Sequence, residues 1–263
     1  MIRFTSISDP NIWSGVDWTI TDEDEVAELV ARVALGQSRH ATKIISSLSP
    51  TLPFPPETAK EGAIRLLTAK DLEKPYHRDG WLFQVLTWIA AHLHRSHTLK
   101  SPPHMIHAHK GFDGLELRVN EDLTSVSSVI ICEQKATENP RNKITSQVWP
   151  EFVSLESGER DNELVAEVTT ILARNGSIDA DEAVAAILWN QSRSYCVSVT
   201  VDDEHNSGAG RKALFGGYDK KIPNGNVDRR GAETFYKPEL RVWMEKLAQK
   251  AIKVVNDMEV ANV

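Results

Sequence analysis

The stretch from Gly111 to Lys135 decides the fold class and contains the candidate site. It reads GFDGLELRVNEDLTSVSSVIICEQK, where Asp113 opens one apolar run and a second run ends in Glu133-x-Lys135. Residues i and i+2 of a strand point to the same face, so Glu133 and Lys135 project together, with Ile131 behind them. Asp113 can join them from the neighbouring strand of a hairpin. Two carboxylates and an ammonium at a sheet edge form a site for a hard divalent cation and a charged oxyanion.

A solvated ion pair is the alternative interpretation, because Glu-x-Lys is common on exposed strands. Here a fully apolar run precedes Glu133, and an acid occurs on the adjacent strand. Two buried acids without a cation cost several kcal/mol, so the arrangement needs a metal ion or a strong lysine pair. Glu116 is the rival acid, but strand alternation places it on the face opposite Asp113. We therefore favour a catalytic interpretation built on Asp113.

Composition limits the class of protein. The chain has 263 residues and a net charge of −7, from 30 basic and 37 acidic residues. This length allows one large domain or two small ones. The acidic balance means that a nucleic-acid partner would need a local basic patch or the help of a partner subunit. Cys132 and Cys196 lie in apolar strand patterns and are predicted to be reduced core residues, and no zinc-binding spacing is present.

Two observations bear on localisation. Residues 1–10 are too polar for a signal peptide, and the longest nearly apolar run, Trp81–Ala91, is too short to span a bilayer. We expect a cytoplasmic protein with no membrane partner.

The remaining pattern gives the order of elements. Apolar periodicity and capping residues predict helices, and apolar runs of strong strand formers predict strands. Predicted helices cover residues 21–36, 57–69, 81–93, 143 onward with an interruption at Pro150, 161–174, 179–189 and 238–255. Predicted strands cover about 104–110, 112–119, 128–136 and 195–201, and residues 48–56 form a proline-rich connector.

This order predicts an α/β or α+β fold, in which helices flank a mixed β-sheet. Three consecutive short strands favour an antiparallel meander, and a later strand joins after a helical crossover. We expect residues 1–56 to form an N-terminal helical extension with the connector. Residues 57–263 would form the domain that carries the site, including a glycine-rich loop over 205–232 and a long C-terminal helix.

The predicted glycine-rich loop is locally basic. Between Gly208 and Lys237, seven basic residues oppose three acids, with aromatic residues interleaved. Such a composition suits a nucleic-acid backbone, while a solvated loop that offsets an acidic protein is the alternative. The candidate nucleic-acid contacts are Arg211, Lys212, Lys220, Lys221, Arg229 and Arg230.

A histidine-rich segment is a second candidate site. Six histidines lie between His92 and His109. His107 and His109 would share a strand face, and His104 could join them in a transition-metal site. Scattered surface histidines are the alternative, and the sequence leaves the choice open.

The order helix, three strands, helix, strand resembles the PD-(D/E)xK phosphodiesterase superfamily, over residues 78–201. These proteins have a restriction-endonuclease-like fold with an αβββαβ core. The resemblance implies that Asp113 and Glu133 are the two metal-binding acids and that Lys135 is the lysine of the motif.

The helices around the motif extend this resemblance. It implies that Gln84, on the opening helix, completes the metal shell. Gln147, twelve residues after Lys135, matches a glutamine that many members carry on the next helix. The fuller Q-x-x-x-Y form is absent, because Glu151 occupies its last position.

The chemistry expected of these residues is phosphodiester hydrolysis. Mg²⁺, or Mn²⁺ in its place, polarises the phosphoryl oxygen and activates water, and it needs only one or two protein carboxylates. Lys135 can position the attacking water and stabilise the charged transition state. The expected function is therefore a metal-dependent DNA endonuclease, with Gln147 as a further catalytic residue.

The biological setting follows from the resemblance alone. It points to nuclease effector subunits of bacterial anti-phage defence, such as those of the Hachiman type or of cyclic-nucleotide signalling systems. A helicase, another ATPase or a sensor subunit would then control the chain. A non-catalytic nucleic-acid-binding or assembly subunit is the main alternative, a small-molecule enzyme using the same acids is a third, and homo-oligomerisation is left open.

Overall fold

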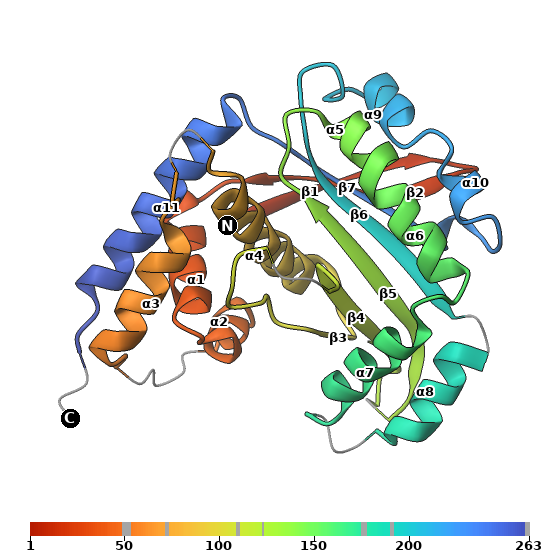
Figure 1. Ribbon diagram of the computed structural model, residues 1–263, viewed down its shortest axis with the longest axis horizontal. Helices are drawn as coiled ribbons and strands as arrows, with labels where there is room; N and C mark the ends of the chain where they lie inside the picture. The colour runs from red at the N-terminus through yellow and green to blue at the C-terminus, as the bar shows by residue number, and fades with distance from the viewer. Residues whose placement is uncertain are drawn as a thin grey trace.

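A seven-stranded mixed sheet organises the protein (Figure 1). The computed structural model describes residues 1–48, 54–71, 74–108, 111–122, 124–174, 178–189 and 192–260. The strands are β1 (Ile2–Asp9), β2 (Trp13–Ile20), β3 (Thr98–Lys100), β4 (Gly114–Val119), β5 (Val126–Lys135), β6 (Arg193–Val201) and β7 (Arg230–Tyr236).

The sheet order is β1-β2-β7-β6-β5-β4-β3. Strands β2, β7, β6 and β5 run parallel, and antiparallel pairs close both edges. Every residue of the central strand β6 is buried, as expected for a parallel strand covered on both faces. The predicted α+β class, a mixed sheet flanked by helices, is confirmed.

Helices cover the two faces of the sheet (Figure 1). The helices form two groups. The first group packs on an apolar core around β4, β5 and β6, and the second group packs on another apolar core around β2 and β7. The first group is α5 (Pro140–Lys143), a π-helical turn (Ile144–Val148), α6 (Trp149–Glu156), α7 (Asp161–Leu172), α8 (Ala180–Trp189), α9 (Gly208–Leu214) and α10 (Tyr218–Lys221). The second group is α1 (Glu23–Ala34), α2 (Ser38–Ile45), α3 (Glu57–Leu67), α4 (Tyr76–His94) and α11 (Leu240–Asp257).

The predicted order of helix, three strands, helices and strand is present from α4 to β6. Cys132 and Cys196 face each other on β5 and β6, and both are buried and free, as predicted. Pro150 interrupts its helix as expected. The preceding turn is π-helical, and the Trp149 amide donates to the Ile144 carbonyl, five residues back. The widened turn accommodates a residue that lacks an N–H group.

Three predictions of local structure were wrong. The first strand of the meander is β3, whereas residues 104–108 form turns and His109 lies outside the described residues. The two prolines at 102–103 separate β3 from this segment. Residues 1–20 are a β-hairpin that joins the sheet beside β7, so the N-terminal extension is not simply helical.

The predicted loop over 205–232 is also wrong, because it contains α9, α10, a 3₁₀ turn (Val227–Arg229) and the start of β7. Strand β7 is rich in polar residues, yet most of it is buried because those residues have partners. Its buried Glu233 accepts from Arg95, and its buried Thr234 donates to Asp17. The polar composition of β7 is therefore the reason that the sequence predicted a loop here instead of a buried strand.

Candidate active site

The end of β5 and the start of β4 bring three charged side chains together. Asp113 directly precedes β4, whose first residue pairs with Cys132 of β5, so Asp113 lies beside the last residues of that strand. The backbone amide of Gln134 donates to Asp113 Oδ2 at 3.0 Å and fixes this carboxylate against β5. Glu133 and Lys135 project from one face of β5, as strand alternation requires.

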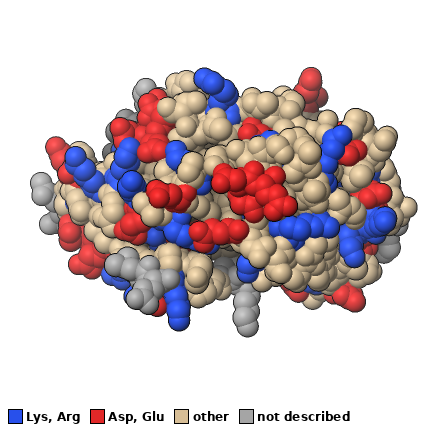
Figure 2. Space-filling view, turned by 90° about the horizontal axis from the view of Figure 1, so that it is seen from above, with Lys and Arg blue, Asp and Glu red and all other residues tan. Residues whose placement is uncertain are grey.

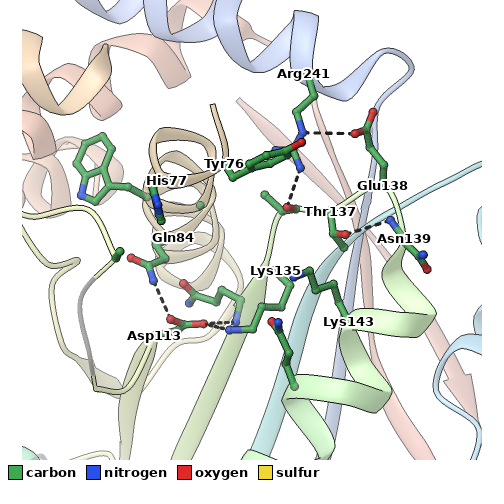
Figure 3. A pocket seen from close by; sticks show the side chains of 16 residues that line it. Tyr76, His77, Gln84, Asp113, Lys135, Thr137, Glu138, Asn139, Lys143 and Arg241 are labelled. Carbon is green, nitrogen blue, oxygen red and sulfur yellow. Dashed lines mark hydrogen bonds and ion pairs between the residues drawn. The ribbon is translucent and has the colours of Figure 1, made fainter. Parts of the chain in front are cut away.

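Lys135 joins the two carboxylates. Its Nζ lies 2.6 Å from Asp113 Oδ2, a contact drawn in Figure 3, and 2.7 Å from Glu133 Oε2. The Glu133 side chain is 7% exposed and that of Lys135 is 21% exposed. The convergence predicted from the sequence is therefore present, whereas the chemical role of the three residues stays a prediction.

The electrostatics of this cluster are not those of a surface ion pair. Burial raises the pKa of Glu133 to about 7, and the nearby Asp113 carboxylate adds to the rise, although Lys135 opposes it. Burial alone would lower the pKa of Lys135, but Glu133 and Asp113 outweigh it and raise that pKa. The lysine therefore stays charged, and Glu133 exchanges its proton near neutral pH.

Helix α4 supplies the next contact. Gln84 Nε2 donates to Asp113 Oδ1 at 2.9 Å, so Asp113 receives donors on both carboxylate oxygens. Gln84 was predicted as a metal ligand, and in the structure its amide nitrogen orients Asp113 instead of leaving this carboxylate free to rotate. Its position at the site agrees with the sequence analysis.

The cluster opens into a cavity of about 670 Å³ (Figure 3). Asp113 and Lys135 line its floor, while Glu133 lies behind them and does not line it. Gln147, from the π-helical turn, also lines the cavity, so all the predicted catalytic residues line this cavity or directly contact a residue that does. The other lining residues are Tyr76, His77, Gly80, Trp81, Gln84, Ala108, Gln134, Ala136, Thr137, Glu138, Asn139, Lys143 and Arg241.

The carboxylates at the cavity suit a hard divalent cation, because Mg²⁺ needs only one or two of them and keeps several waters. Asp113 lines the cavity, and Glu133 is joined to Asp113 through Lys135. The Gln134 side chain, which also lines the cavity, has a buried Oε1 with no hydrogen-bond partner. Within the described residues, no three His, Cys, Asp or Glu side chains gather where they could hold a metal, so a site here would rest on two carboxylates.

The histidine-rich segment has another role in the described part of the chain. His92 Nδ1 contacts the Trp88 carbonyl at 2.9 Å, and His107 Nε2 contacts the Leu66 carbonyl at 2.8 Å. His104 Nε2 contacts the Phe112 carbonyl at 3.3 Å. These rings tie α4 and the segment before β4 to the backbone, and His109 lies outside the described residues.

The six predicted nucleic-acid contacts divide into two sets. Arg211 pairs with Asp17 at 2.7 Å, and Arg229 binds both oxygens of Glu156 at 3.1 and 2.9 Å. Arg230 is buried and donates to the Ile222 carbonyl at 3.1 Å. These arginines hold the fold together. The exposed members are Lys212, Lys220 and Lys221.

The surface charge is mixed. On the face drawn in Figure 2, basic and acidic side chains alternate, and the largest group of one sign is acidic. Such a face does not offer a long basic track to a duplex. None of the helices in the described residues is both long and apolar enough to cross a membrane.

Sequence reasoning missed several cavity residues. Helix α4 begins with Tyr76 and His77, five residues before the predicted start, and Pro75 at the cap was the available signal. Arg241 comes from α11, more than a hundred residues from the motif, and no local pattern could place it there.

Comparison with known proteins adds no relative. No family model matches the chain, and no curated protein and no solved structure matches it significantly. Any functional conclusion therefore rests on the site itself.

Proposed function

We propose that this protein is a metal-dependent nuclease that hydrolyses phosphodiester bonds in DNA. The observation that carries the proposal is Lys135 shared between Asp113 and Glu133 at the floor of an open cavity. A purely structural triad would saturate its charges, whereas here the pKa of Glu133 rises to about 7. Perturbed acids in a cleft mark functional sites.

Each residue has a defined part in this proposal. Asp113 and Glu133 hold the divalent ion, which supplies Lewis acidity and a water of lowered pKa when bound. Gln84 orients Asp113 through its 2.9 Å hydrogen bond. Lys135 stays protonated and faces the phosphoryl oxygens, where its point charge offsets the negative charge that develops.

Further lining residues would hold the substrate. Gln147 and Lys143 line the same cavity as Asp113 and can donate to phosphate oxygens. Fixing the phosphodiester against several donors lowers the entropic cost of reaching the in-line geometry.

Cleavage of single-stranded DNA and, in parallel, of plasmid by the full chain tests the proposal, with Mg²⁺, Mn²⁺ or EDTA. Asp113→Asn, Glu133→Gln and Lys135→Met should each lower the rate at least about 100-fold, as loss of a transition-state contact does. Glu116→Gln is the matched control, because it removes a buried carboxylate from the other face of the same sheet. Circular dichroism must show that every variant is folded.

Two results would contradict the proposal. Cleavage that persists in Glu133→Gln, or that is indifferent to EDTA, excludes this site as its source. Metal-independent DNA binding without cleavage favours the alternative, a non-catalytic nucleic-acid-binding or assembly subunit.

We further propose that the nuclease is an effector of bacterial anti-phage defence, held in check by a helicase, another ATPase or a sensor subunit. The motif resemblance supports this setting, and a chain of net charge −7 needs help to engage DNA. Expression of the chain alone should be toxic to cells, Glu133→Gln should abolish the toxicity, and co-expression of the partner should relieve it. Equal growth of wild type and variant contradicts this role.

A further inference from the structure

An exposed aromatic ring lies at the mouth of the candidate active site. Tyr76 is the first residue of α4, and 58% of it is exposed. It lines the same cavity as Asp113 and Lys135, at the end where α11 passes (Figure 3). A large exposed ring is costly to hydrate, so its fixed position beside charged groups needs an explanation.

The ring is held from behind by a buried ion network. The Arg241 guanidinium lies 5.2 Å from the centroid of the Tyr76 ring, and Arg241 Nη1 lies 2.7 Å from Asp79 Oδ2. Asp79 is fully buried and also accepts from Arg78 Nε at 2.7 Å. Because breaking a buried pair is strongly unfavourable, Arg241 is fixed, and the cation positions the ring that covers it.

This arrangement leaves a preorganised stacking surface in the cavity. One part of the ring contacts Arg241, and the remainder is open. Among the other lining residues, Lys143 has no ion-pair partner among the described residues, and Asn139 and Gln147 offer amides. A ligand that fits would be aromatic at one end and anionic at the other, which describes a nucleotide.

Duplex DNA cannot use the ring. In a duplex the faces of each base are covered by its neighbours, and only the base edges are accessible in the grooves. Stacking on a protein aromatic requires an unpaired base, and single-strand-binding proteins combine such rings with cations along the backbone. The cavity, at about 670 Å³, has the size of a small-ligand pocket.

We propose that the site takes single-stranded DNA and that Tyr76 stacks on the base beside the phosphate held at Asp113, Glu133 and Lys135. The inference rests on the proposed nuclease function and names the strand state of its substrate. Tyr76 is then a residue that determines specificity, and Arg241 is a positioning residue that acts through it.

Binding measurements test the substrate class separately from cleavage. A short labelled strand, alone or in a blunt duplex, is titrated with the full chain in Ca²⁺ and followed by fluorescence anisotropy. The single strand should bind more tightly than the duplex. Tyr76→Ala and Tyr76→Leu should weaken single-strand binding roughly five- to a hundredfold, the range for loss of one base–aromatic stack. Tyr76→Phe and Tyr76→Trp should keep it, and no variant should change duplex binding.

Phe54→Ala is the matched control, since Phe54 is 55% exposed and does not line the cavity. Duplex binding as tight as single-strand binding, or Tyr76→Leu indistinguishable from Tyr76→Phe, overturns the inference. Glu133-dependent cleavage of the blunt duplex as fast as of the single strand overturns it too, while leaving the nuclease proposal intact. Tyr76-dependent single-strand binding without metal-dependent cleavage supports the binding surface and rejects the nuclease.

Discussion

Two charged clusters occupy opposite faces of the same sheet, and each contains two acids and one base. On one face Lys135 joins Asp113 and Glu133. On the other, Arg95 binds both oxygens of Glu116, at 3.0 and 2.7 Å, and Glu233 Oε1 at 2.5 Å. The formal charge is the same in the two clusters, so their differences come from geometry and access.

The arginine cluster is saturated. The Ser198 hydroxyl donates to the second oxygen of Glu233 at 2.6 Å, and the planar guanidinium matches the Glu116 carboxylate. Burial alone would lower the pKa of Arg95, but the neighbouring Glu116 and Glu233 carboxylates outweigh burial and raise this pKa above its ordinary value. Every carboxylate oxygen of the cluster therefore has a donor, and the cluster stabilises the packing of α4 on β4 and β7.

The lysine cluster is unsaturated. A single ammonium serves two carboxylates, and its cavity admits a phosphate-sized ligand. Burial raises the pKa of Glu133 to about 7 although Lys135 opposes the rise, so the ammonium does not fully offset the cost of burying this carboxylate. The comparison teaches that a lysine shared between two acids leaves a carboxylate oxygen available to a cation, whereas an arginine that binds both oxygens of one carboxylate does not.

The largest difference between the clusters is expected in the free energy of unfolding when the basic residue of each, Arg95 or Lys135, is replaced. Arg95→Met leaves Glu116 and Glu233 buried without a cation and should lower the free energy of unfolding by about 3–5 kcal/mol. Lys135→Met should cost less, because Glu133 can take up a proton near neutral pH and the cavity admits water.

Urea unfolding with and without Mg²⁺ measures both effects. Mg²⁺ should restore stability to Lys135→Met, since an ion that binds only the folded state stabilises it, and it should stabilise Arg95→Met no more than it stabilises the wild type. Equal losses in the two variants would show that the clusters do not differ in the way described.

A smaller effect is expected from pH. The pKa of Glu133 rises from 4.5 to about 7 on folding, so the folded chain binds this proton more tightly than the unfolded chain. The contribution of Glu133 to the free energy of unfolding is therefore greatest below pH 4.5. It decreases as pH rises towards 7, by roughly 3 kcal/mol at most, and is level above that.

The difference between wild type and Glu133→Gln isolates this contribution. Unfolding is measured across pH in EDTA, and the wild type should lose stability relative to the variant between pH 4.5 and 7. Glu116→Gln, from the arginine cluster, controls for the loss of a carboxylate. A constant wild-type-minus-Glu133→Gln difference over that range would disprove the raised pKa.

The two clusters also differ in how far the sequence could predict them. Asp113, Glu133 and Lys135 lie within one hairpin, so strand alternation and one turn were enough to bring them together. Arg95 and Glu233 are 138 residues apart, and their contact depends on the position of β7 beside β6. That strand was concealed because its polar residues are buried with partners that only the folded chain supplies.

The same reason explains the misassigned basic residues. Arg211 and Arg229 were predicted to be surface contacts because arginine in a glycine-rich segment favours an exposed loop. Each pairs with an acid from a distant element, Asp17 of β2 and Glu156 of α6. Composition indicates that a segment is basic, but long-range packing decides which charges remain free.

The smallest effect is expected from the free charges, Lys212, Lys220 and Lys221 on α9 and α10. If this surface guides the backbone of a single strand towards the lysine cluster, replacing all three with Gln removes up to three phosphate contacts. The slope of log affinity against log salt should then become shallower by roughly 2, because each contact to a single strand contributes about 0.7. Affinity at high salt should hardly change, and the preference for single strand over duplex should remain, since it depends on Tyr76. Lys246→Gln with Lys253→Gln, exposed lysines of α11, is the control for a change in net charge alone. An equal change of slope in that control would show a general field effect, and an unchanged slope in the triple variant would show that DNA reaches the cavity without touching α9 and α10.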